Sequence, residues 1–373
     1  MKKIPFVDLF KQYLKIKLEI DAAIDDVIST SSFIRGPHVD AFEKNFSKMV
    51  NREFCISCAN GTDSLYIAMK ALGLKDGDEV IVPAHSWIST SETVTQAGGV
   101  PVFCDTELDT FTIDVKKISD KISKKTVGII PVHLYGYPAD MDSIVKLANL
   151  NNLWVLEDCA QAHMSKYKGQ IVGTFGRVAS FSFYPGKNLG AMGDAGAIVT
   201  NEPELAKKMT MFARHGGINK GDHHIEGINS RMDGMQAAIL SVKLKYLEKW
   251  TKRRQEIANL YSQLLRDVKG LTIPRSIEDR EHVWHLYVIQ SEWRDELFNY
   301  LKSNGVDTII NYPVALPFLP AYKRFSHKHE EYPVAFYHQS RILSLPIYPE
   351  MEIEDVHLVS NLIINFHLSK QAI

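Results

Sequence analysis

A single lysine, Lys187, lies within a run of small, apolar and aromatic residues that extends from Ser180 to Gly196. Such surroundings remove water from the ammonium group, which lowers its pKa and favours the neutral amine that Schiff-base chemistry requires. The glycines at positions 186, 190, 193 and 196 allow tight backbone turns around this lysine. The hydroxyl groups of Ser180 and Ser182 and this glycine-rich wrapping argue against an ordinary lysine on a surface loop.

A carboxylate follows a stretch that is typical of a buried strand, and the sequence there reads Val155-Leu156-Glu157-Asp158. We expect Asp158 at the carboxyl edge of a sheet, where open α/β sheets bind their ligands. At that edge Asp158 could pair with a protonated ring nitrogen or with a cation. Taken by itself, the same pattern is also typical of a helix cap at the end of a strand.

The segment Asn60-Gly61-Thr62-Asp63-Ser64 joins a predicted strand to a predicted helix. Small residues let a ligand approach the backbone closely, and the free N–H groups at a helix N-terminus attract anions. The segment therefore indicates a phosphate site, although a plain helix cap has the same appearance.

These three features match what a protein supplies to pyridoxal phosphate, namely a phosphate cradle, an acid and a lysine. The acid keeps the pyridine nitrogen protonated so that the ring can act as an electron sink. The lysine holds the cofactor and then moves protons. Their joint occurrence along one chain is far more specific than any one of them.

The elements that must position these residues alternate between strands and helices from residue 54 to about residue 199. This alternation is typical of an α/β domain with a mostly parallel sheet. The predicted strands cover residues 54–59, 79–83, 102–104, 127–133 and 153–157. The predicted helices cover most of residues 1–30 and residues 39–49, 64–72, 89–97 and 144–150.

After the lysine run, the pattern of predicted helices and strands changes. Residues 231–265 predict one or two long helices, because apolar residues recur there at spacings of three and four. A strand at 285–289, a helix at 293–304 and a strand at 308–310 then indicate a smaller α+β domain. We expect residues 1–250 to form an N-terminal arm and a large α/β domain, and residues 251–373 to form the small domain.

The charge balance excludes several classes of protein. The 373 residues include 43 Lys and Arg and 44 Asp and Glu, so the basic excess of a nucleic-acid binder is missing. The apolar runs are shorter than the roughly 18 residues of a membrane helix, and the first residues lack the apolar core of a signal peptide. We expect a cytoplasmic protein with no nucleic-acid or membrane partner.

The four cysteines lie at positions 55, 58, 104 and 159. Cys55 and Cys58 form a C-x-x-C pair, but a structural zinc site needs a second pair of ligands, and the sequence offers none that matches. The cysteines are therefore expected to be reduced, partly buried thiols of a cytosolic protein, and no metal site is predicted.

Motifs spread over nearly the whole chain resemble those of the DegT/DnrJ/StrS sugar aminotransferases, which are pyridoxal phosphate enzymes of fold type I. Besides the lysine run, the matching segments are residues 5–9, 33–37, 77–83, 157–161, 227–231 and 344–346. The resemblance implies an aspartate aminotransferase-like α/β fold, with a mainly parallel mixed sheet flanked by helices and a smaller C-terminal α+β domain.

The resemblance also implies roles for individual residues around the cofactor. Lys187 resembles the Schiff-base lysine and proton shuttle, and Asp158 resembles the partner of the pyridine nitrogen. Gln161 is expected beside the phenolic oxygen of the cofactor, and Trp87 is expected to stack on the cofactor ring.

The phosphate contacts implied by the resemblance come from two subunits. Ser182 and the backbone of Gly61 and Thr62 are expected to bind the phosphate within one subunit. Asn229 resembles the residue that reaches the phosphate from a neighbouring subunit. The resemblance therefore implies a homodimer with shared active sites.

The substrate contacts are expected at four further residues. His223 and His224 could bind sugar hydroxyls or a diphosphate, but they could equally belong to a solvated polar loop. Arg231 could meet an anionic group of the amino donor or of the sugar nucleotide, or form a surface salt bridge. Tyr184, in the lysine run, is also predicted to contact the substrate.

The lysine at position 187 indicates transamination, because related dehydratases carry histidine at this position. The resemblance implies glutamate as donor, 2-oxoglutarate as its product, and C3 of a dTDP-linked 3-keto-6-deoxyhexose as acceptor. The open alternatives are a UDP-linked 3-keto uronic acid, a 4-keto hexose, a pyridoxal phosphate lyase or racemase, and a non-catalytic sensor. Two departures from the family pattern, Asn311-Tyr312-Pro313 and Met164-Ser165, concern the substrate pocket.

Overall fold

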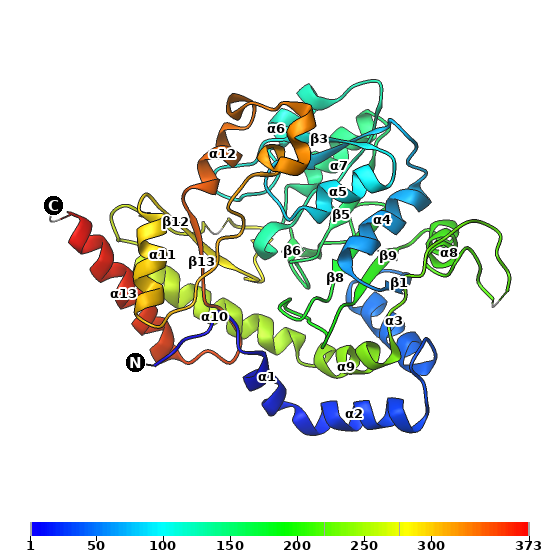
Figure 1. Cartoon of the computed structure of the whole chain (residues 1–373), viewed down its shortest axis with the longest axis horizontal. Coiled ribbons are helices and arrows are strands. Elements are labelled where there is room, and N and C mark those ends of the chain that lie inside the picture. Colours follow the sequence, from blue (N-terminus) through cyan, green and yellow to red (C-terminus); the bar gives the residue numbers. More distant parts are fainter. Residues whose placement is uncertain (1, 220, 276, 372–373) are drawn as a thin grey trace.

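A seven-stranded sheet lies at the centre of the computed structural model, which describes residues 2–219, 221–275 and 277–371 (Figure 1). Its strand order is β1-β9-β8-β5-β4-β2-β3. The strands are β1 (Phe54–Cys58), β2 (Glu79–Pro83), β3 (Val100–Cys104), β4 (Thr126–Ile129), β5 (Trp154–Asp158), β8 (Val178–Ser182) and β9 (Gly196–Thr200). Among these described strands, β9 alone runs against the others, because it pairs antiparallel with both β1 and β8. The predicted mainly parallel mixed sheet is confirmed.

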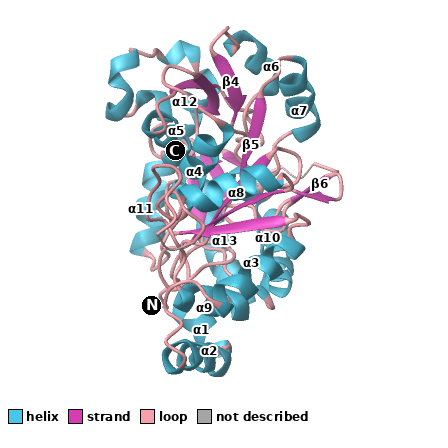
Figure 2. Ribbon diagram, turned by 90° about the vertical axis from the view of Figure 1, so that its right-hand side faces the viewer, coloured by secondary structure: helices cyan, strands magenta, loops and turns pink. Residues whose placement is uncertain are grey.

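Helices cover both faces of this sheet, as Figure 2 shows. The helices of one face are α3 (Pro37–Met49), α7 (Met141–Leu150) and α9 (Gly234–Leu244), and those of the other are α4 (Gly61–Leu72), α5 (Ser89–Gln96) and α8 (Pro203–Phe212). Successive side chains of a strand point to opposite faces. Ile81 accordingly packs in the first core, whereas Val80 and Val82 pack in the second. Burial on both faces explains why these strands are nearly continuously apolar.

Three of the predicted cofactor-binding residues lie at the carboxyl edge of the sheet. Asp158 is the last residue of β5, and Ser182 is the last residue of β8. Gly61 opens α4 two residues after Ala59, which follows the end of β1. Because β1, β5 and β8 run in the same direction, these three positions lie along one edge of the sheet.

The C-terminal part of the chain builds a second, smaller core around an antiparallel sheet of order β10-β12-β13. Its elements are α10 (Leu247–Leu265), β10 (Leu271–Thr272), β12 (Tyr287–Ser291), α11 (Arg294–Ser303), β13 (Ile342–Leu345) and α13 (Ile353–Gln371). The proposed domain boundary between residues 250 and 251 falls inside α10 and stays a prediction. The predicted strand at 308–310 is reduced to a single bridge between Ile309 and Ser344.

The segment before α12 (Pro333–Gln339) returns to the large sheet. Ala315, Tyr322 and Tyr332 are buried in the same core as Val80 and Phe103. The remaining short elements are α6 (Val115–Ile118), β6 (Lys166–Tyr167), β7 (Gln170–Ile171) and β11 (Arg280–Glu281), and these strands form a small sheet of order β11-β6-β7. The C-terminal segments are therefore tied to the large sheet at more than one place.

The N-terminal arm consists of α1 (Leu9–Lys15) and α2 (Lys17–Ser29), which run along one edge of the molecule beside α9 (Figure 1). Ile16 and Ile20 pack against Ile239 in a small core. The opposite side of the arm leaves Phe10 and Leu18 67% and 85% exposed. Among the described residues, every helix is too short or too polar to span a lipid bilayer.

Candidate active site

Lys187 is held by a tight loop that follows β8. The N–H of Lys187 donates to the carbonyl oxygen of Tyr184 at 2.8 Å, and the N–H of Ala191 donates to that of Phe183 at 2.8 Å. Gly190 is required in this loop, because a Cβ there would lie 2.2 Å from the carbonyl oxygen of Pro185. Burial lowers the pKa of Lys187 to about 8, against the opposing effect of the Asp158 charge. The loop therefore presents an amine that can be neutral near physiological pH.

Asp158 lies buried at the end of β5, with hydrogen bonds to both of its carboxylate oxygens. The hydroxyl of Thr90 donates to Oδ2 at 2.9 Å, and the N–H of Ala160 donates to Oδ1 at 3.1 Å. Burial raises the pKa of Asp158, while these two donors and the charge of Lys187 oppose the rise. The two donors favour an ionised carboxylate that can accept a further hydrogen bond from a protonated nitrogen.

The start of α4 has the groups that the predicted phosphate cradle requires. The side chain of Asn60 caps the helix by accepting a hydrogen bond from the N–H of Asp63 at 2.8 Å. A Cβ at Gly61 would lie 2.5 Å from Cβ of Ser182, so glycine is needed to bring β8 against the helix start. The hydroxyl of Thr62 lies 2.7 Å from that of Ser89. Helix N–H groups and serine and threonine hydroxyls at one place fit the phosphate of pyridoxal phosphate.

Gln161 has its amide orientation fixed by two tyrosines. Its Oε1 accepts from the N–H of Tyr135 at 2.6 Å, and its Nε2 donates to the hydroxyl of Tyr312 at 3.0 Å. The ring of Tyr312 lies 5.4 Å from the ring of Trp87, which is 57% exposed. The segment around Tyr312 therefore forms a wall beside Gln161 and Trp87. Sequence reasoning missed Tyr312 as a site residue; the available signal is that Asn311-Tyr312-Pro313 departs from the family pattern.

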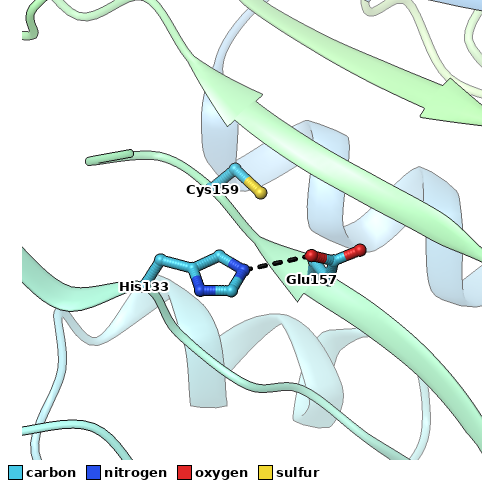
Figure 3. Close-up of side chains that lie close together, drawn as sticks. All are labelled: His133, Glu157 and Cys159. Atoms are coloured by element: carbon cyan, nitrogen blue, oxygen red, sulfur yellow. Dashed lines mark hydrogen bonds and ion pairs between the residues drawn. The ribbon is translucent and has the colours of Figure 1, made fainter. Parts of the chain in front are cut away.

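His133, Glu157 and Cys159 form a buried group at the end of β5 (Figure 3). Potential metal-ligand atoms of the three residues lie within 4.8 Å of one another. The carboxylate of Glu157 already accepts four hydrogen bonds, from His133 Nε2 and from the backbone N–H groups of residues 173, 175 and 176. Burial opposes ionisation of Glu157, but these donors together lower its pKa. The group is thus explained as a hydrogen-bonded anchor for the strand that carries Asp158.

Two histidines near Lys187, the buried His163 and the half-buried His285, were also missed by sequence reasoning. His163 is fully buried between the rings of Phe181 and Phe183. Burial and the charge of Lys187 lower the pKa of His163 to about 3, and the same causes lower that of His285 well below its usual value. Both imidazoles therefore stay neutral and add no positive charge beside the lysine. The position of His163 two residues after Gln161 was the available signal.

The side chains of the other predicted substrate and phosphate contacts make no direct contact with Lys187 or Asp158 that the described residues record. His223 donates through Nδ1 to the carbonyl oxygen of His215 at 2.8 Å, and His224 pairs with Asp222 at 2.6 Å. Asn229 is exposed, and Tyr184 is 59% exposed. Among the described residues, no hydrogen bond or ion pair joins these side chains, or that of Arg231, to Lys187 or Asp158. Their roles stay predictions.

Comparison with known proteins gives matches over nearly the whole chain. Residues 14–363 match the DegT/DnrJ/EryC1/StrS aminotransferase family. A protein of Geobacillus stearothermophilus named pleiotropic regulatory protein is 41% identical over 366 residues, which cover 98% of each chain. The dTDP-3-amino-3,6-dideoxy-alpha-D-galactopyranose transaminase of Aneurinibacillus thermoaerophilus is 40% identical over 356 residues, which cover 95% of this chain and 97% of the relative.

Solved structures agree with this result. The crystal structure of DesV from S. venezuelae, in complex with a ketimine intermediate, superposes with a TM-score of 0.96. It is 38% identical and covers 98% of this chain and 99% of that chain. The likeness confirms the predicted fold type, and pyridoxal phosphate, the cofactor of such enzymes, fits the cradle, Asp158 and Lys187. The chain belongs to the DegT/DnrJ/EryC1/StrS aminotransferase family.

Proposed function

We propose that this aminotransferase moves the amino group of L-glutamate to C3 of a dTDP-linked 3-keto-6-deoxyhexose. The product would be a 3-amino-3,6-dideoxyhexose for O-antigen, another surface glycan or a glycosylated metabolite. The observation that carries the transfer chemistry is the arrangement of Lys187 beside Asp158 at the carboxyl edge of the sheet. A lysine of lowered pKa beside a buried carboxylate is what amino-group transfer on a pyridine cofactor needs.

In this proposal, some residues of the site bind the cofactor and Lys187 transfers protons. When bound, pyridoxal phosphate supplies the electron sink and carries the amino group between the two substrates. Lys187, with a pKa of about 8, can take up and return a proton at its Nζ near neutral pH. Asp158 would accept the hydrogen bond of the pyridine nitrogen, while Thr90 and Ala160 hold its carboxylate in place. The start of α4 and Ser182 would hold the phosphate.

The proposed sugar and nucleotide are supported by names of relatives and by the His223-His224 loop. The relatives include transaminases named for dTDP-linked 3-amino-3,4,6-trideoxyglucose and 3-amino-3,6-dideoxygalactose. Other relatives are named for UDP-linked 3-keto sugars. The paired histidines in residues 222–233 resemble the branch that acts on 3-keto sugars. We therefore favour a 3-keto acceptor, with dTDP as the nucleotide.

We further propose that two copies of the chain share their active sites. Asn229 would reach the cofactor phosphate of the other subunit, in keeping with its exposed position. The exposed apolar side chains of the N-terminal arm, among them Phe10, Leu14 and Leu18, are suited to contact a second copy.

The test is an assay with the purified protein, pyridoxal phosphate and glutamate. The protein is offered dTDP-3-keto-6-deoxyhexose, dTDP-4-keto-6-deoxyhexose or a UDP-3-keto uronic acid, and the products are identified by mass spectrometry. An amino sugar from the dTDP-3-keto substrate alone supports the proposal in full. If only one of the other two sugars gives an amino sugar, the aminotransferase activity is supported and the proposed acceptor is wrong.

A second readout separates an enzyme from a sensor. Glutamate should bleach the yellow colour of the cofactor-loaded protein, because the amino group passes to the cofactor. A protein that keeps its colour in glutamate, and forms no amino sugar from any of the three acceptors, would be a non-catalytic binding protein.

A further inference from the structure

Three arginines gather beside Asn229. Arg35, Arg214 and Arg231, which we call the arginine cluster, lie on three segments that are paired by isolated bridges, and all three are half-buried. Two antiparallel bridges hold the segments together, and they pair Ile34 with Asp233 and Arg214 with Asn229. Arg231 lies on the middle segment between the two bridges.

The cluster is anchored next to the phosphate cradle. Ser230, which precedes Arg231, donates to Oδ2 of Asp63 at 2.7 Å and accepts from the N–H of Ala59 at 3.1 Å. Asp63 lies in the first turn of α4. The middle segment, which carries Arg231, is therefore fixed against the helix start that is predicted to bind the cofactor phosphate.

The described part of the chain gives the guanidinium groups of the cluster no ion-pair partner. Across the described residues, no hydrogen bond or ion pair involves the guanidinium group of Arg35, Arg214 or Arg231. The acids that act on Arg214 from α3 are Asp40 and Glu43. Glu43 uses Oε1 to accept hydrogen bonds from the N–H and the hydroxyl of Ser57, at 2.8 and 2.7 Å.

Three unpaired guanidinium groups repel one another unless an anion neutralises them. Burial, together with the charges of Arg35 and Arg231, lowers the pKa of Arg214, against the opposing charges of Glu43 and Asp40. Guanidinium groups bind phosphate oxygens in pairs of parallel hydrogen bonds, so several of them suit a multiply charged phosphate better than a single carboxylate. The cofactor phosphate already has its own cradle at Gly61 and Ser182.

We propose that the arginine cluster binds the diphosphate group of the nucleotide-linked substrate. The inference rests on the proposed function, which supplies a substrate with such a group. It assigns a binding role to Arg35 and Arg214, and it makes the diphosphate the anion that Arg231 meets.

The test is a calorimetric titration of the cofactor-loaded protein with inorganic pyrophosphate, a probe that does not depend on the nucleotide base. Arg35→Gln and Arg214→Gln should each raise the dissociation constant about tenfold, the effect expected for a lost charge-assisted contact. Arg214→Lys keeps the charge but loses the planar guanidinium group. Its dissociation constant for pyrophosphate should therefore lie between those of Arg214→Gln and the unaltered protein. The matched control is Arg253→Gln on α10, because Arg253 is also half-buried but is paired with Glu256 at 2.8 Å. It should bind pyrophosphate as the unaltered protein does.

Equal pyrophosphate affinity in all variants, or no binding to the unaltered protein, would overturn the proposal. The proposal would also be overturned if the variants lose affinity for pyridoxal phosphate but keep their affinity for pyrophosphate. Affinity for pyridoxal phosphate is measured by fluorescence titration of the cofactor-free protein. Thermal unfolding of each variant verifies that it is folded. Bleaching of the unaltered protein by glutamate is recorded separately, so a failure of the proposed transamination is distinguishable from a failure of this site.

Discussion

The hydroxyl of Thr90 donates a hydrogen bond of 2.9 Å to Oδ2 of Asp158, across 68 positions of the sequence. Thr90 is itself held by the hydroxyl of Ser86, which lies 2.9 Å away. The segment that follows β2 thereby fixes the carboxylate at the end of β5. This contact gives Asp158 a donor that favours its ionised form, although burial works against the charge.

We expect Thr90→Val to lower turnover about tenfold, because a hydrogen bond to a charged group is lost in a buried place. The pKa of Asp158 should rise further, so the pH profile of the variant should lose activity at a higher pH on its acid side. Steady-state rates measured across pH check both effects. Thr90→Ser keeps the hydroxyl and should restore the profile. A valine variant with an unchanged pH profile would contradict the positioning role.

Asp158→Asn should lower turnover roughly a hundredfold, since the neutral amide removes the charge that stabilises a protonated pyridine nitrogen. The substitution changes the side chain little in size, so the variant should stay folded. Circular dichroism and the rate with glutamate check these expectations. The matched control is Asp142→Asn, because Asp142 is exposed and forms a surface ion pair with Lys168. Unchanged kinetics of Asp158→Asn would refute its role.

Lys187→Ala should abolish turnover while the protein stays folded, because Lys187 supplies the amine whose charge acts on Asp158. Product formation and thermal unfolding are measured side by side. Lys252→Ala, at an exposed position on α10, serves as the control and should be fully active. Normal turnover of the Lys187 variant would refute the assignment of the site.

The stability of the cofactor-free protein should depend on pH through Lys187. Its pKa is about 8 in the folded chain, against an ordinary value of 10.5. Between these values the unfolded chain binds the proton and the folded chain does not, so stability rises with pH. Lys187→Met removes this dependence, and its advantage in Tm over the unaltered protein should be largest below pH 8. That advantage should shrink as the pH approaches 10.5. An advantage that is constant with pH would mean that the lysine is not desolvated.

Mixing two defective subunits tests the shared active site. Lys187→Ala and Asn229→Ala are co-expressed with different tags, and the mixed dimer is purified. One of its two sites then carries both defects, while the other has an intact lysine and an intact Asn229. We expect about half of the normal activity from the mixed dimer. Activity no higher than the mean of the two parent variants would show that Asn229 acts within its own subunit.

The element pattern was accessible from the sequence because it depends on local properties. The apolar run of β2 was predicted at the residues where it occurs, 79–83, since its burial on both faces leaves a continuous apolar signature. The strand predicted at 127–133 ends at Ile129 in the structure. Pro131 has no N–H to donate to a sheet, and beyond it only a single bridge, from Val132 to Asp158, continues the pairing.

The reactive residues were also accessible, because each one lies in a distinctive local run. Lys187 among glycines, Asp158 after an apolar strand and Gly61 at a helix start each depend on a few neighbouring positions. The sequence by itself thus determined the fold class and the cofactor, and it predicted the lysine that is expected to carry the chemistry.

Only the tertiary structure decided which distant residues meet. Thr90 reaches Asp158, Tyr312 reaches Gln161, and three separate segments bring the arginine cluster together. Such meetings depend on the order and direction of strands and on the packing of loops, which no local spacing records. Burial, which sets the pKa of Lys187 and Asp158, likewise exists only once the chain has closed around them.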